Sequence, residues 1–193
     1  MKTIIIIPSR LSATRLPGKP LLKINGLSII SHVFKKAVDA QIGEVYVATE
    51  DQEIIDDVKK NGGQAILTKK DHKTGTDRIY EAIKKMGISD IELIMNLQGD
   101  EPLMNPEDIK NLHTQMIKTD SKLGTLASKI SNKDFYYKQN IVKVITDEKF
   151  ENSNFPYAVN FVRKIDNLNI NIYHHLGIYC YQLKTLEKFI SLN

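Results

Sequence analysis

The sequence predicts an α/β protein with a doubly wound, mostly parallel sheet that has a mixed extension. Two observations support this fold class. Short, β-branched apolar runs alternate along the chain with stretches whose apolar residues recur at helical spacing. The first run, Thr3–Pro8, is apolar over nearly its whole length, which is typical of a central parallel strand covered on both faces.

The predicted elements follow one another in a regular order. Strands are expected at 3–8, 44–49, 64–67 and 91–96, and helices at 28–40, 51–60, 75–86 and 105–118. Asn105 and Pro106 suit the cap and first position of the last of these helices. The later segments 123–130, 140–146 and 173–181 are strand-like, without strong helices between them. They indicate a sheet extension, so we expect a single domain spanning residues 1–193.

Composition excludes several classes of protein. The chain has 193 residues, of which 41% are apolar and 26% charged, so it is neither disordered nor fibrous. The net charge of +4 is dispersed, which disfavours a nucleic-acid partner. Ile4–Ile7 is far too short to cross a membrane. The single cysteine, Cys180, and the lack of a signal-like N-terminus favour a cytoplasmic protein.

The loop that follows the first strand, Pro8–Pro20, has the composition of a polyphosphate site. It contains the cations Arg10, Arg15 and Lys19, together with hydroxyls such as that of Thr14. Arginine and lysine bind phosphate oxygens well. The loop is not a Walker loop, because alanine and proline occupy positions 13 and 20, and no G-x-G-x-x-G follows the strand. An ordinary solvated loop remains the alternative interpretation.

Other polar residues follow the later strands, at 49–51 and 98–101. The carboxyl ends of parallel strands meet at one edge of the sheet, where ligands bind. Asp100 is therefore the expected Mg²⁺ ligand, with Glu101 as a less favoured substitute, since magnesium commonly takes one or two carboxylates. The alternative is that Asp100 is only a turn residue after Gly99.

Six motifs occur in order along the whole chain. They are I-P-S-R-L-S-A-T-R-L-P-G-K-P-L at 7–21, V-A-T-E-D at 47–51, H-K-T-G-T-D-R at 72–78, N-L-Q-G-D-E-P at 96–102, N-I-V-K-V at 140–144 and H-L-G-I-Y at 175–179. Together they resemble the 3-deoxy-manno-octulosonate cytidylyltransferase family, also called CMP-Kdo synthetases. Sialic-acid cytidylyltransferases resemble the first loop but lack the later segments as a set.

The resemblance implies a nucleotide-diphospho-sugar transferase fold, a homodimer and a specific reaction. CTP and the sugar acid Kdo would give CMP-Kdo and pyrophosphate with Mg²⁺, for lipopolysaccharide synthesis. The nucleotide-binding residues implied are Pro8, Arg10, Thr14, Arg15, Lys19, Thr74, Gly75, Thr76 and Arg78, of which Arg10, Arg15 and Lys19 would grip the triphosphate. Asp100 would hold the metal, and Gln98, Arg163, His175 and Tyr179 would face the sugar.

The chain departs from the family at its C-terminal end. Family members continue past residue 193 with a segment that carries a second metal-binding aspartate, so the resemblance describes a chain truncated relative to the family. Two alternatives to the full activity therefore stay open. One is a catalytically weakened nucleotide-binding module, and the other is a related CMP-sugar synthetase of the sialic-acid type.

Overall fold

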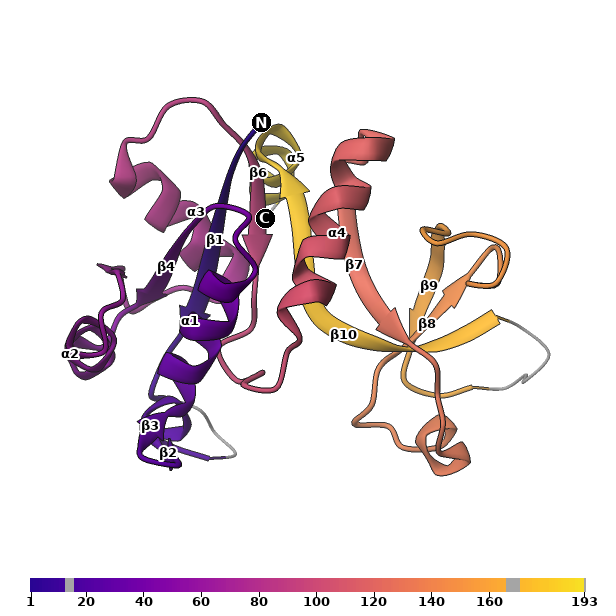
Figure 1. Cartoon of the computed structure of the whole chain (residues 1–193), viewed down its shortest axis with the longest axis horizontal. Coiled ribbons are helices and arrows are strands. Elements are labelled where there is room, and N and C mark those ends of the chain that lie inside the picture. Colours follow the sequence, from indigo (N-terminus) through magenta and orange to yellow (C-terminus); the bar gives the residue numbers. More distant parts are fainter. Residues whose placement is uncertain (13–15, 166–170, 193) are drawn as a thin grey trace. The chain divides into compact units, whose positions relative to one another are not determined.

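The computed structural model describes residues 1–12, 16–165 and 171–192 (Figure 1). The chain forms two compact units. The first unit comprises Met1–Gly124 and Ile178–Asn193, and the second comprises Thr125–Gly177. Compact units can belong to one folded domain, so the single domain stays a prediction.

The first unit is built on the predicted parallel sheet. Its strands are β1 (Lys2–Ser9), β4 (Glu44–Thr49), β5 (Ala65–Leu67) and β6 (Ile91–Asn96), in the order β5-β4-β1-β6. Ile5 pairs with Val45 on one side and with Met95 on the other, both in parallel. The end of β10 (Asn171–Gln182) pairs antiparallel with β6, so the sheet is mixed. The predicted fold class is confirmed.

Helices cover both faces of this sheet. They are α1 (Ile29–Asp39), α2 (Gln52–Lys60), α3 (Gly75–Met86), α4 (Pro106–Thr119) and α5 (Leu183–Ile190). Ile4 and Ile6 pack with Ile79 of α3 and Leu186 of α5. Because side chains alternate along a strand, Ile5 and Ile7 face the opposite side, and both are buried. On that side α1 packs on β1 and β4, and also contacts α2 and α4.

A short hairpin of β2 (Lys23–Ile24) and β3 (Leu27–Ser28) precedes α1. Its turn has positive φ angles at Asn25 (49°) and Gly26 (82°), as a type I′ turn requires. Ser28 then caps α1, and its hydroxyl accepts a hydrogen bond from the backbone N–H of Ser31. This hairpin is absent from the sequence-based prediction because two-residue strands carry too little periodicity.

The second unit is antiparallel. It contains the end of β7 (Leu123–Ser128), the 3₁₀ helix η2 (Lys133–Tyr136), β8 (Lys143–Thr146), β9 (Ala158–Val162) and the beginning of β10. β8 pairs with β10 and with β9, and β7 pairs with β10. The strands expected at 123–130, 140–146 and 173–181 are present with shifted ends. β9 and α5 were not predicted.

Candidate nucleotide site

A cavity of about 290 Å³ lies in the first unit, beyond the carboxyl ends of β1 and β6. The loop after β1, the start of α3 and the segment after β6 line it. Of the residues predicted from the sequence, this cavity brings together Pro8, Arg10, Lys19, Thr74, Gly75, Arg78, Gln98 and Asp100. The polar residues after β1 and β6 therefore meet at one edge of the sheet as expected, whereas residues 49–51 and Glu101 do not line the cavity.

Two glycines allow these segments to approach one another. A Cβ atom on Gly99 would lie 3.0 Å from the carbonyl oxygen of Pro8 and 3.2 Å from Ile30 Cδ1. A Cβ atom on Gly75 would lie 3.3 Å from Pro8 Cγ. Pro8, at the end of β1, thus lies between the segment after β6 and the first residue of α3. Larger residues at either glycine would separate the walls of the cavity.

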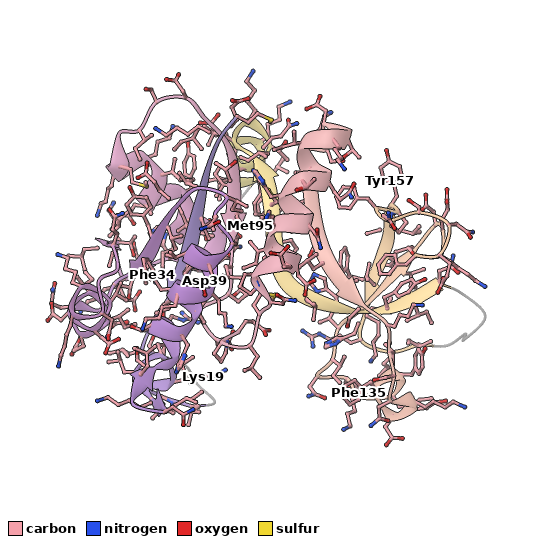
Figure 2. The ribbon with its side chains drawn as sticks, in the orientation of Figure 1. Lys19, Phe34, Asp39, Met95, Phe135 and Tyr157 are labelled. Atoms are coloured by element: carbon pink, nitrogen blue, oxygen red, sulfur yellow. The ribbon has the colours of Figure 1, made fainter. Side chains whose placement is uncertain are left out.

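The loop after β1 is tied down at both ends. The backbone N–H of Leu11 donates to the carboxylate of Asp51 at 2.7 Å, and that of Gly18 donates to the carbonyl of Leu11 at 3.0 Å. Gly18 has a left-handed φ of 69°, which glycine adopts without strain. Lys19, labelled in Figure 2, follows immediately, and its Nζ donates to Asp100 Oδ2 at 2.7 Å. The predicted cation and the predicted metal ligand are therefore in direct contact.

The beginning of α3 lies in the cavity wall. Thr74 is the N-cap, and it forms a capping box with Asp77, in which each side chain bonds the other residue's backbone N–H. Thr74 and Gly75 both line the cavity. A helix N-terminus presents backbone N–H groups and a partial positive charge, which favour a bound anion such as phosphate.

Arg78 is placed differently from the other cations. Its guanidinium is buried and is paired with Glu50, and it also donates to Thr68 Oγ1 at 2.6 Å and to the carbonyl of Lys69 at 3.3 Å. These contacts hold its plane in a fixed orientation at the cavity wall. Because Glu50 balances its charge, Arg78 adds little net positive charge to the cavity. It contributes a guanidinium of fixed orientation whose N–H groups can donate to a ligand.

His72 and Lys73 also line the cavity, although neither was predicted as a site residue. The imidazole of His72 pairs with Glu81 of α3, whose carboxylate also accepts from Lys85. Burial raises the pKa of Glu81, but the hydrogen bonds from Lys85, His72 and the backbone of Lys69 outweigh it and lower the pKa to about 2. The hydrogen bond of His72 therefore fixes it to Glu81 on α3. The H-x-x-G-T-x-R spacing alone could have suggested His72 as a wall residue.

Ser9 was also missed. It lines the cavity, and its buried hydroxyl has no hydrogen-bond partner in the described part of the chain. Buried hydroxyls are almost always hydrogen-bonded in folded proteins, so an orphaned one beside a cavity is consistent with a polar ligand.

The chemistry of the donor set fits a divalent cation. Burial raises the pKa of the Glu101 carboxyl, and the charge of the adjacent Asp100 raises it further. A cation at this point would relieve that repulsion. Within residues 1–12, 16–165 and 171–192, no group of three potential ligands gathers. Magnesium does not need one, because water and phosphate oxygens complete its shell.

The remaining predicted residues lie elsewhere or outside the description. Thr14 and Arg15 fall outside the described residues. Thr76, in the first turn of α3, hydrogen-bonds Tyr181 and does not line the cavity. Tyr179 pairs with Asn96 across β10 and β6, and its ring stacks on that of Tyr181.

Arg163 and His175 belong to the second unit. Arg163 follows β9, and its Nη1 donates to the carbonyl of Gln139 at 3.0 Å. His175, in β10, lies 3.0 Å from Thr125 Oγ1 through its Nε2, and its ring meets that of Phe161 edge-on. Burial lowers the pKa of His175, and the neighbouring His174 lowers it further.

The parallel strands, with a cation-lined cavity at their carboxyl ends, have the arrangement of an α/β protein that binds an anionic ligand such as a nucleotide. The cytidylyltransferase family model matches residues 4–192. A 3-deoxy-manno-octulosonate cytidylyltransferase from Thermodesulfovibrio yellowstonii is 39% identical over 204 aligned residues, covering 100% of this chain and 80% of the relative. One from Rhodopseudomonas palustris is 39% identical, covering 99% and 78%. The chain belongs to the cytidylyltransferase family and, within it, to the 3-deoxy-manno-octulosonate cytidylyltransferases.

Solved structures agree with this assignment. A CMP:2-keto-3-deoxy-manno-octonic acid synthetase complexed with CTP superposes with a TM-score of 0.88 and 34% identity, covering 100% of this chain and 79% of the other. A 4-diphosphocytidyl-2C-methyl-D-erythritol synthase from Anaerococcus prevotii has a TM-score of 0.59 at 18% identity, which shows the shared fold alone. No helix in the described ranges combines the length and apolarity needed to span a bilayer.

Proposed function

We propose that this protein activates 3-deoxy-manno-octulosonate (Kdo) with CTP, giving CMP-Kdo and pyrophosphate for lipopolysaccharide synthesis. The observation that carries the proposal is the contact between Lys19 and Asp100 in the cavity at the strand ends. A cation that binds phosphate and an acid that can hold a metal lie side by side there. The relatives named as Kdo cytidylyltransferases and the synthetase solved with CTP support the choice of substrates.

The reaction is a direct displacement at phosphorus. The anomeric hydroxyl of Kdo attacks the α-phosphorus of CTP, the new C–O–P linkage forms, and the bond to pyrophosphate breaks. The proton of the hydroxyl is lost to solvent. Protein residues then contribute by orienting the two substrates and by stabilising charge on the phosphate oxygens, without a covalent intermediate.

Residues of the cavity have distinct parts in this proposal. Arg10 and Lys19 bind the triphosphate, and the N-terminal turn of α3 adds a backbone donor at Gly75. By the family motif, Arg15 is assigned to the triphosphate and Thr14 to the nucleotide. The fixed guanidinium of Arg78 helps to hold the nucleotide.

Magnesium is proposed as the cofactor. Asp100 would bind it, with Glu101 adjacent. When bound, the ion would neutralise charge on the phosphate oxygens of CTP and pyrophosphate. The chain's own contribution is to hold Asp100 against Lys19, so that the carboxylate and the ammonium face the same substrate.

The sugar acid would meet a second set of residues. Gln98 lines the cavity and lies 3.3 Å from Asn96 through its Nε2. Arg163 is proposed to bind the carboxylate of Kdo, because a guanidinium forms bidentate contacts with carboxylates. His175 and Tyr179 are proposed to face the sugar hydroxyls.

A cytoplasmic homodimer is also proposed. β9 is paired with β8, and Val159 and Phe161 are 65% and 45% exposed. Tyr157, at 81% exposure, directly precedes this strand (Figure 2). β9 is the last strand in the sheet order, and the unpaired backbone groups of an edge strand form a template for pairing. Its exposed apolar side chains mark an interaction surface, and a second copy of this chain is the occupant that the family suggests.

The proposal is tested by measuring pyrophosphate release with CTP, Kdo and Mg²⁺ present, and with each omitted in turn. Release that requires all three components, with CMP-Kdo as the other product, supports it. Calorimetric binding of CTP without turnover would instead indicate a nucleotide-binding module. Turnover with a sialic acid in place of Kdo would indicate the related synthetase.

A further inference from the structure

Lys143 stands out in the second unit because its side chain is charged and fully buried. It is the first residue of β8, and its exposure is 0%. It pairs with Val162 of β9 on one side and with His174 of β10 on the other. An ammonium group inside such a row of strands is costly unless its donors are matched.

Backbone carbonyls satisfy this ammonium. Nζ donates to the oxygen of Lys138 at 2.7 Å and to the oxygen of Arg163 at 3.0 Å. Over the residues that the structure describes, no carboxylate forms an ion pair with it. Burial lowers the pKa of Lys143, and the positive charge of Arg163 lowers it further. The ammonium group is therefore stabilised by hydrogen bonds to backbone carbonyls and not by a carboxylate.

Both accepting carbonyls lie outside the strands. Lys138 lies between η2, where Phe135 is labelled in Figure 2, and β8, while Arg163 directly follows β9. The guanidinium of Arg163 reaches back to the same segment, where Nη1 donates to the oxygen of Gln139 at 3.0 Å. Arg163 is thus linked to residues 138–139 twice, directly by its own hydrogen bond to Gln139 and indirectly by the two hydrogen bonds of the Lys143 ammonium.

Packing alone does not account for a lysine at this position. A methionine of similar length would fill the space without the cost of burying a charge. A methionine cannot donate hydrogen bonds to two carbonyls. The distinctive contribution of Lys143 is to restrain two stretches of backbone. One is at Arg163, and the other is at residues 138–139, to which the guanidinium of Arg163 is hydrogen-bonded.

We propose that Lys143 is a positioning residue that holds Arg163 ready to receive the carboxylate of the sugar acid. The inference rests on the proposed function, in which Arg163 binds Kdo. Lys143 itself touches no substrate. A guanidinium restrained before binding loses less conformational entropy when it pairs with a carboxylate, so the effect falls on the sugar acid and not on CTP.

The test is a double-mutant cycle on the full chain, with Lys143→Met, Arg163→Met and both together. Initial rates of pyrophosphate release give the KM for Kdo at saturating CTP, and the KM for CTP at saturating Kdo. Lys143→Met is expected to raise the KM for Kdo about tenfold to a hundredfold. The KM for CTP should stay within about twofold, and the double variant should be no worse than Arg163→Met. The matched control is Lys133→Met, an exposed lysine of η2, which should change neither KM.

Three outcomes overturn the proposal. One is a double variant whose defect is the product of the two single defects, because the two residues would then act independently. Another is an equal rise of both KM values, or no change, in Lys143→Met. If Lys143→Met does not fold, Lys143→Gln is carried through the same cycle, since it keeps an N–H donor without charge. The third outcome is failure of both variants to fold, because a purely structural role would then explain why a lysine is buried at position 143.

Failure of the proposed function gives a different result. If Arg163→Met leaves the KM for Kdo unchanged, then Arg163 does not bind the carboxylate, whatever Lys143 does. If the parent protein shows no turnover of CTP with Kdo, the proposed function itself fails.

Discussion

Replacing Asp100 with asparagine separates a metal-binding role from a structural one. The side chains of Lys19 and Asp100 are 34% and 55% exposed, and they meet at 2.7 Å. Exposed pairs of this kind contribute about 0–1 kcal/mol to stability. Removing the charge also relieves the repulsion that raises the pKa of Glu101. The net change in Tm should therefore be at most about 2–4 °C.

The expected loss of activity is much larger. Asparagine keeps the shape of the side chain but replaces a charged metal ligand with a neutral one. A metal that stabilises charge on transferring phosphate oxygens contributes several kcal/mol, so turnover should fall by about a hundredfold or more. The affinity for CTP in the absence of metal should stay the same or rise slightly, because Lys19 remains and is no longer neutralised by Asp100.

The assay is pyrophosphate release at saturating CTP, Kdo and Mg²⁺, alongside thermal unfolding without ligands. The matched control is Glu187→Gln, which removes the acid of another exposed pair, with Lys84 at 3.3 Å. Glu187→Gln should show a similarly small change in Tm and full turnover. Turnover of Asp100→Asn within a fewfold of the parent would refute the reasoning. So would a loss of stability large enough to explain the lost activity, which would make Asp100 a turn residue.

Three further predictions follow from the cavity and its walls. Arg10→Ala should remove a charge-assisted contact and weaken CTP binding by about 1.5–3 kcal/mol, as measured by calorimetry; an unchanged Kd contradicts the role. Gly99→Ala should lower the free energy of unfolding in urea by about 1–3 kcal/mol, because the new methyl group meets the rigid carbonyl of Pro8 at 3.0 Å. In the folded chain the pKa of the Glu81 carboxyl is lowered from 4.5 to about 2, so the unfolded chain binds this proton more tightly. The stabilising contribution of the carboxylate is therefore complete above about pH 4.5. That contribution, up to about 3 kcal/mol, should be lost as the pH falls toward 2, and Glu81→Gln should flatten this part of a curve of stability against pH.

Several elements could be predicted because their signals are local. The run of isoleucines in β1 is apolar on both faces, and α1 to α4 each carry an amphipathic pattern over nine or more residues. β9 escaped prediction because four of its five residues are exposed, so it shows no burial pattern to find. α5 has only eight residues and follows directly from β10, where a strand pattern passes into a helical one without a turn signal.

The candidate site was predictable in part for the same reason. Arg10, Lys19 and Asp100 stand in the segments that follow β1 and β6, and the carboxyl ends of parallel strands share one edge. The partners of the buried groups were not predictable. Arg78 pairs with Glu50, 28 residues away, and the ammonium of Lys143 bonds backbone carbonyls, which no side-chain motif encodes.

The order of amino acids alone was enough to establish the alternating strands and helices, the edge at which ligands bind and the family, because each depends on short-range patterns. The folded chain was needed to show which charges remain available to a substrate and which are already paired. Lys19 and Asp100 are 81 positions apart, and Gly99, next to Asp100, lets the segment after β6 approach the backbone of Pro8. Such contacts follow from the packing of whole elements, so tertiary structure decides them.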